Sequence, residues 1–216
     1  MRTPPALRGG FLLRLVGLVV GLFLCSCGIV LFLESELGLP PWDILHQGIA
    51  EQGGISFGVA NLAVSLALLA LAWSLRAPIG LGTLLNAILV GSSVIVLLTL
   101  EPVSALSDEG LGVRIWLLPA ALVCFGVGSA FYIAAAMGAG PRDSLMLVAS
   151  QRLGLRIATA RTAIEVIVLA IGFALGGTAG LGTLVFAIGI GPTVEVSFWL
   201  LGRTPLALTE VASSAA

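Results

Sequence analysis

Two glutamates, Glu165 and Glu195, stand inside long apolar runs in the second half of the chain. An ionised carboxylate costs on the order of 2.5–3.5 kcal/mol at the centre of a membrane helix, so such residues face a cavity or a partner. We therefore expect both to lie on the pathway of a substrate or an ion. For Glu165 the structural alternative is an ion pair with Arg161, one helical turn earlier. For Glu195, which has no basic residue that close, the alternatives are protonation or packing against Asn86.

The segments PWD and PRD, which start at positions 41 and 141, carry four further candidates: Trp42, Asp43, Arg142 and Asp143. Proline suits the first turn of a helix, and an early carboxylate accepts free backbone N–H groups there. Helix initiation alone therefore explains both aspartates. The functional alternative is that these short helices re-enter the membrane or line a vestibule, with all four side chains on a solute pathway. A helix lying in the membrane interface, with Trp42 on its apolar face, is a third interpretation.

The sequence GLGT occurs twice, at 80–83 and 180–183, and ends each time on a threonine, Thr83 or Thr183. Glycine permits close approach of another backbone, and a threonine hydroxyl can cap a helix or contact a ligand. Tight packing is the simpler interpretation. Asn86, one turn after the first GLGT, is a further polar candidate within an apolar run.

The apolar runs around these residues predict an integral membrane protein. Of the 216 residues, 58% are hydrophobic and 10% are charged, and the mean hydropathy is +1.14. A soluble domain carries about 25% charged residues. Runs of about 20 apolar residues match the length that an α-helix needs to cross a bilayer. We expect an all-α fold with six transmembrane helices, at about 11–33, 57–75, 80–100, 113–136, 157–175 and 180–200.

The two halves of the chain resemble each other. A shift of 100 positions aligns them without a gap, and about a quarter of the aligned residues are identical. Each unit, about 11–100 and about 111–200, holds one crossing, a short P-x-D helix (about 41–52 and 141–153) and two more crossings. An odd number of crossings inserts the second unit upside down, as in many secondary transporters. We expect a single membrane domain over 1–216, with short polar ends at 1–10 and 203–216.

The charges fit this inverted arrangement. Arginine is favoured on the cytoplasmic side of a membrane. If the N-terminus is cytoplasmic, all arginines except Arg114 fall inside, and most acidic loop residues fall outside. The same placement puts PWD outside and PRD inside, which accounts for the opposite charge of the two copies. Both termini are then predicted to be cytoplasmic.

Several classes of function find no support in the sequence. A net charge of −1 suggests no nucleic-acid partner. Cys25, Cys27 and Cys124 lie in apolar runs without the spacing of a metal site, and we expect them to be core residues. His46 is the single histidine, and no HExxH or GxSxG motif occurs. We therefore expect no metal, no cofactor and no enzyme activity.

The repeated motifs resemble those of the YczE/YitT-type family of multipass bacterial membrane proteins. The resemblance covers about 14–200 and rests on GLPPWD at 38–43, GAGPRD at 138–143, the two GLGT segments and IGP at 190–192. The chain is more similar to the YczE branch, because it lacks the soluble C-terminal domain of many YitT-like members. The resemblance implies a protein of the bacterial cytoplasmic membrane and says little about its substrate.

The leading hypothesis is a transporter embedded in the lipid bilayer that moves a small solute, with proton coupling through Glu165 or Glu195. It rests on analogy of fold, which does not establish function. The alternatives are a channel-like pore and an accessory or receptor protein. A homodimer could form through Gly17-x-x-x-Gly21 or Gly172-x-x-x-Gly176, since paired small residues let membrane helices approach closely.

Overall fold

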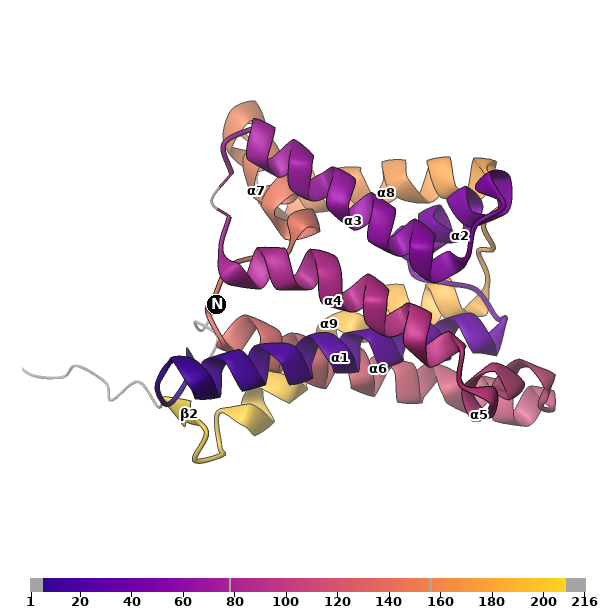
Figure 1. Cartoon of the computed structure of the whole chain (residues 1–216), viewed down its shortest axis with the longest axis horizontal. Helices are drawn as coiled ribbons and strands as arrows, with labels where there is room; N and C mark the ends of the chain where they lie inside the picture. The colour runs from indigo at the N-terminus through magenta and orange to yellow at the C-terminus, as the bar shows by residue number, and fades with distance from the viewer. Residues whose placement is uncertain (1–5, 78, 156, 209–216) are drawn as a thin grey trace, which may run out of the picture.

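The computed structural model describes residues 6–77, 79–155 and 157–208, and nearly all of its regular structure is helical (Figure 1). Within these described residues, five helices are long and apolar enough to cross a membrane, and a further helix has a shorter apolar stretch at Thr162–Ala174. The long helices are α1 (Phe11–Ser35), α3 (Phe57–Ser74), α4 (Leu81–Leu98), α6 (Leu111–Ala134), α8 (Ile157–Ala174) and α9 (Leu181–Leu201), and the P-x-D helices are α2 (Pro41–Gly53) and α7 (Pro141–Leu153).

Local chemistry sets the ends of the P-x-D helices. Each begins at the proline of its motif, where a missing N–H costs nothing. Each ends at a glycine in the left-handed region, Gly54 with φ 61° and Gly154 with φ 64°. All eight predicted helices are present, and their ends lie within two residues of the expected positions.

The helices α1 and α6 form the central antiparallel pair. Gly21 and Gly128 face each other so closely that a Cβ on Gly21 would lie 2.6 Å from the Gly128 carbonyl oxygen. Further along, Gly28 lies against the ring of Phe125. Small residues thus let the two backbones approach, and the buried Leu18, Leu22 and Ile29 of α1 pack into the main core.

An arginine at the start of each central helix donates hydrogen bonds to backbone carbonyls at the end of the other. Arg14, at the start of α1, donates to the carbonyl oxygens of Ala135 and Ala136 after α6, both at 2.7 Å. Arg114, at the start of α6, donates to the carbonyl oxygen of Ser35 at 2.8 Å. Free carbonyls and the helix dipole both favour a cation at a helix C-terminus, so Arg14 and Arg114 have the same structural role at equivalent positions of the two halves.

Each P-x-D helix packs on a long helix of the other half. The helix α2 lies on α8, where Gln52 donates to the Leu175 carbonyl oxygen at 3.1 Å. The helix α7 lies on α3, where Arg152 donates to the Leu75 carbonyl oxygen at 2.9 Å. The two halves therefore interlock, and the short helices lie among the long ones rather than as isolated surface elements.

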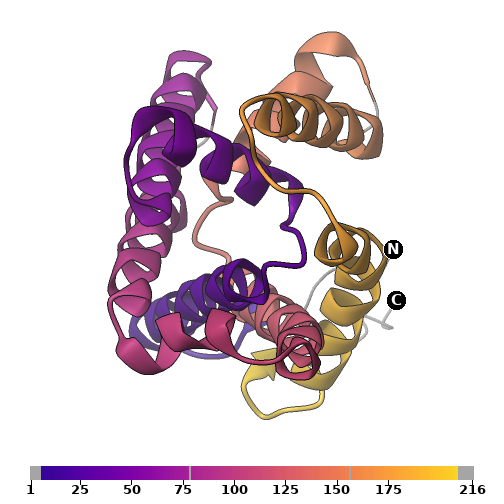
Figure 2. The same cartoon turned by 90° about the vertical axis from the view of Figure 1, so that its right-hand side faces the viewer.

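Two features were not expected. The connection between the halves contains a short helix, α5 (Glu101–Ser104), and a 3-10 turn (Ala105–Asp108). Near the chain ends, the two-residue strands β1 (Ala6–Leu7) and β2 (Ala207–Leu208) pair antiparallel. The otherwise all-α fold, seen from a second side in Figure 2, is therefore joined by this strand pair at the two ends of its described part.

Candidate functional site

The equivalent residues of the two P-x-D motifs meet in the interior. The guanidinium carbon of Arg142 lies 5.1 Å from the centre of the Trp42 ring, a cation–π contact. Trp42 is buried, with 8% of its surface exposed, and Arg142 is half-buried. The motif residues that sequence analysis placed on opposite sides of the membrane are thus direct neighbours, because α2 and α7 both reach the middle of the bundle.

His46, one turn after Asp43 on α2, joins this pair to further polar groups. Its Nδ1 lies 3.2 Å from Asp43 Oδ1 and 3.1 Å from Asn61 Nδ2 of α3. Its Nε2 lies 3.4 Å from a terminal nitrogen of Arg142. Asp43, His46 and Asn61 are all buried, with no more than 1% exposed. We call Trp42, Asp43, His46, Asn61 and Arg142 the central cluster.

The partners of His46 decide where its proton lies. Arginine has no acceptor, so Nε2 must accept from Arg142, and the ring proton sits on Nδ1 and points to Asp43. Burial lowers the pKa of His46 below its ordinary value. A protonated Nδ1 cannot accept from Asn61. Whichever way its amide is turned, Asn61 therefore keeps a buried polar atom without a partner.

The central cluster has unused hydrogen-bonding capacity. Among the described side chains, two buried polar atoms lack a partner: Trp42 Nε1 and Asn61 Oδ1. Of the five N–H groups of Arg142, the described contacts use one, the bond to His46. Buried polar groups are satisfied in most proteins, so unsatisfied ones that gather at one place mark a site for water or a ligand.

Asp143 extends the cluster on the α7 side. Its Oδ2 accepts from the Tyr132 hydroxyl at 3.4 Å, and the same hydroxyl accepts from the backbone N–H of Gly140. Asn86 of α4 lies beside Gly140, since a Cβ there would be 3.3 Å from the Asn86 amide. Three sequence candidates thus lie together at the start of α7: Arg142 and Asp143 on the helix itself, and Asn86 beside it.

The two GLGT threonines position the P-x-D helices. Thr83 donates to the Ala139 carbonyl oxygen at 2.6 Å, and Thr183 donates to the Leu39 carbonyl oxygen at 2.8 Å. Each hydroxyl also accepts from the N–H of the first glycine of its own motif at 3.1 Å. Both hydroxyls are therefore engaged with backbone, which fits the packing interpretation rather than ligand contact.

Glu165 and Glu195 lie outside the central cluster. Glu195 is exposed on α9 and Glu165 is half-buried on α8. The side chain of Arg161 lies outside the described residues, so the expected pair with Glu165 remains a prediction. The sequence motifs proposed for a dimer pack within the chain: Gly21 faces α6, and Gly172 faces the backbone of Leu45 on α2.

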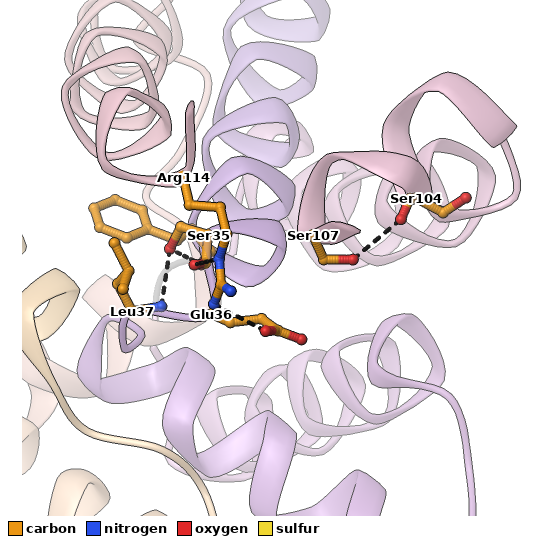
Figure 3. Close-up of polar contacts among 7 residues, drawn as sticks. Ser35, Glu36, Leu37, Ser104, Ser107 and Arg114 are labelled. Carbon is orange, nitrogen blue, oxygen red and sulfur yellow. Dashed lines mark hydrogen bonds and ion pairs between the residues drawn. The ribbon is translucent and has the colours of Figure 1, made fainter. Parts of the chain in front are cut away.

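A separate pocket of about 420 Å³ opens at the C-terminal end of α1 and reaches α2. Its lining includes Glu34, Glu36 and Gln47. Figure 3 shows Arg114 at this end of α1, where it pairs with Glu36 at 2.8 Å and donates to the Ser35 carbonyl oxygen. Arg114, the one arginine that the charge analysis placed outside, thus has a local structural role.

Sequence analysis did not select three residues of this site as candidates: His46, Asn61 and Tyr132. His46 was noted only as the single histidine, although it follows Asp43 by three residues and so shares its helix face. Tyr132 carried no signal, because nothing in sequence links it to Asp143. Their roles arise from contacts between helices that spacing along one helix does not predict.

Comparison with known proteins places the chain in a family. The family of unknown function DUF6198 matches residues 12–198. An uncharacterized protein of Haemophilus influenzae is 36% identical over 189 residues, covering 87% of this chain and 84% of the relative. The uncharacterized membrane protein YczE of Bacillus subtilis is 33% identical over 171 residues, covering 78% of this chain and 77% of the relative.

The uncharacterized protein YyaS of Bacillus subtilis is 26% identical over 183 residues. No solved structure matches the chain. The expected resemblance to YczE is confirmed, and the apolar helices agree with the description of that relative as a membrane protein. The chain is therefore a multi-pass integral membrane protein that belongs to the DUF6198 family, together with YczE-like proteins.

Proposed function

We propose that this protein is a small-solute transporter built from two inverted units of three crossings each, and that the central cluster binds the solute. The observation that carries the proposal is that two buried polar atoms without a partner among the described residues, Trp42 Nε1 and Asn61 Oδ1, lie in one cluster with the half-buried guanidinium of Arg142. Both units contribute to it, as in transporters whose sites lie at the repeat interface near the midplane of the bilayer.

The contacts between the halves support the inverted arrangement. The helices α1 and α6 occupy equivalent positions in the two halves, and they run in opposite directions. Thr83 of the first half bonds to the second half, and its equivalent Thr183 makes the same bond to the first half. Gln52 and its equivalent Arg152 likewise each bond to the end of a long helix in the other half. In this proposal α8 is the sixth crossing, and the paired chain ends lie on the cytoplasmic side of a bacterial cytoplasmic membrane.

The unused groups indicate the chemistry of the solute. Trp42 and Arg142 offer N–H donors, and Asn61 offers the end of its amide that does not face His46. A carboxylate or another oxygen acceptor on a small polar solute would satisfy the donors, and a second polar group on the solute would pair with Asn61. The proposal includes no catalytic step, metal, cofactor or nucleic acid.

The test is a thermal-shift screen of the purified protein against small polar solutes such as amino acids. Trp42→Phe keeps most of the ring and removes the N–H, and Trp73→Phe, at a residue 76% exposed, is the matched control. We expect a solute that raises the melting temperature of the wild type and of Trp73→Phe but not of Trp42→Phe. A stabilising solute that acts equally on both variants would refute the assignment of the site.

A channel or an accessory protein remains the alternative to a transporter. A channel would conduct its solute without saturation, and an accessory protein would bind without moving anything across the bilayer. Flux measurements on reconstituted protein separate these outcomes from the proposal.

A further inference from the structure

Of the five residues of the central cluster, His46 is the one whose side chain ordinarily titrates near neutral pH. The two glutamates that sequence analysis selected for proton coupling lie elsewhere, with Glu195 exposed on α9 and Glu165 half-buried on α8. His46 lies where the two halves meet, with its buried ring between Asp43 of its own helix and Arg142 of α7. A proton on this ring is therefore in direct contact with residues assigned to the solute.

The second half shows that the position of His46 does not need a histidine for packing. The equivalent residue of α7, 100 positions later, is Met146, which is buried and packs with Trp42 and Val168. Methionine fills buried space with a flexible apolar side chain. The histidine of α2 adds what methionine lacks, two ring nitrogens that together hold one proton or two.

The contact with Arg142 and the protonation of His46 exclude each other. The ring proton is on Nδ1 and faces Asp43, so Nε2 is the free base, and it accepts from a terminal nitrogen of Arg142 at 3.4 Å. A second proton can bind only at Nε2, where it would point at the N–H groups of a guanidinium that has no acceptor. Arg142 must therefore leave Nε2 before His46 becomes an imidazolium.

A carboxylate on a solute would draw Arg142 away from the ring. A carboxylate accepts two parallel N–H bonds from one guanidinium, and these are stronger than one bond to a neutral ring nitrogen. Arg142 would then no longer compensate Asp43, which is buried with 1% exposed. A proton on His46 supplies the missing positive charge, because Nδ1 lies 3.2 Å from Asp43 Oδ1. A carboxylate and a proton together add no net charge to the buried site.

The charges around His46 act on its pKa in opposite directions. Burial lowers the pKa of His46, the hydrogen bond to Asp43 raises it, and the charge of Arg142 lowers it. An anion that neutralises the guanidinium removes one lowering influence and leaves that of Asp43 in place. The pKa of His46 is therefore higher with an anion on Arg142 than without one.

Asp43 and Arg142 are the charged groups whose contact with the His46 ring is described. The helix α3, which brings Asn61 to the ring, carries no charged residue. The other titratable groups on α2 and on the elements around it are Glu51 on α2, Asp143 and Arg152 on α7, Arg161 and Glu165 on α8, Glu34 and Glu36 at the end of α1, and Tyr132 on α6.

We propose that His46 is the proton-binding residue of the transporter, and that Nε2 takes up a proton when the carboxylate of a solute draws Arg142 away from it. This inference rests on the proposed transport function and adds to it a coupling ion, one proton for each carboxylate. A proton from water adds to the lone pair of Nε2, and otherwise only hydrogen bonds of Arg142 change. On release of the solute, Arg142 returns to Nε2 and the proton goes back to water.

Nuclear magnetic resonance tests the first step, because His46 is the single histidine of the chain and ¹⁵N-labelled histidine reports it alone. The protein is purified without a histidine tag and titrated between pH 5 and pH 8. The wild type should show a neutral ring with its proton on Nδ1 at pH 7. In Arg142→Met the ring should titrate at higher pH than in the wild type. Arg152→Met, at an exposed arginine of the same helix, should leave the wild-type curve unchanged.

Formate, which stays ionised over this pH range, is the probe for the carboxylate of the solute. It should shift the wild-type ring toward the imidazolium, and chloride at equal ionic strength should not. Formate should have no such effect in Arg142→Met. Between the pKa values of His46 without and with the anion, the affinity for formate should rise about tenfold for each unit that the pH falls. This dependence should vanish in His46→Gln, which cannot titrate.

A titration curve of His46 that is the same in Arg142→Met and in the wild type would overturn the inference. A wild-type ring that responds to none of formate, acetate and glycine would do so as well, and this measurement needs no variant to fold. A solute that stabilises the wild type but not Trp42→Phe, and does so equally at pH 5 and pH 8, would show that proton coupling at His46 had failed while the solute site stands.

Discussion

Replacing Arg142 with methionine tests the central cluster most sharply. Methionine fills similar space but removes the cation over Trp42, the donor to His46 Nε2 and the positive charge near Asp43. A hydrogen bond from a charged group contributes about 1.5–3 kcal/mol. With about 0.5–1 kcal/mol from the cation–π contact, we expect a loss of about 2–4 kcal/mol.

Arg152→Met is the matched control on the same helix. Arg152 is exposed and donates to the Leu75 carbonyl oxygen at the end of α3, so its loss should cost about 0.3–1 kcal/mol. At about 2–4 °C per kcal/mol for a chain of this size, Arg142→Met should melt roughly 5–15 °C below the wild type. Thermal unfolding in detergent, followed by tryptophan fluorescence, measures both.

A double variant separates charge from packing. If Asp43 is left uncompensated in Arg142→Met, then Asp43→Asn should cost less in that background than in the wild type, by about 1–2 kcal/mol. Equal melting temperatures for the two arginine variants, together with strictly additive effects of the Asp43 and Arg142 changes, would show that no charge cluster exists at this place.

Three further predictions concern the frame around the site. Thr83→Val and Thr183→Val each remove one hydroxyl that donates to a carbonyl, and each should lower the free energy of unfolding by about 1–2 kcal/mol; unequal effects would argue that the two halves are not equivalent. Gly21→Leu should disrupt the α1–α6 contact by far more than Gly112→Leu, since a Cβ at Gly112 meets nothing within 4 Å; similar expression and melting of both variants would contradict this packing. Single cysteines at Asp108 and Arg203 should react with a membrane-impermeant maleimide from outside and inside the cell respectively, and labelling of both from one side would refute the proposed topology.

Hydropathy and local signals were enough to predict the helices. Apolar runs of the right length give the long helices, and proline with glycine sets the ends of α2 and α7. The spacing of 100 residues also indicated that Arg14 and Arg114, or Thr83 and Thr183, have equivalent roles. These features depend on residues near each other in the chain, which is why sequence carries them.

The site itself could be predicted only in part. Trp42, Asp43 and Arg142 were candidates because their motif recurs, but their contact across the two halves depends on how α2 and α7 pack into the bundle. His46, Asn61 and Tyr132 owe their positions to that packing. Glu195 was recognised as costly in an apolar run, and the structure shows it exposed on α9, outside the central cluster.

Solute exchange in proteoliposomes tests the transport proposal most directly. A solute found by thermal shift is loaded inside at high concentration, and uptake of its radiolabelled form from outside is followed for the wild type, Trp42→Phe and Arg142→Met. The account predicts saturable counterflow in the wild type and little in either variant. Binding of the solute by the wild type without any counterflow, or counterflow that survives in both variants, would contradict it.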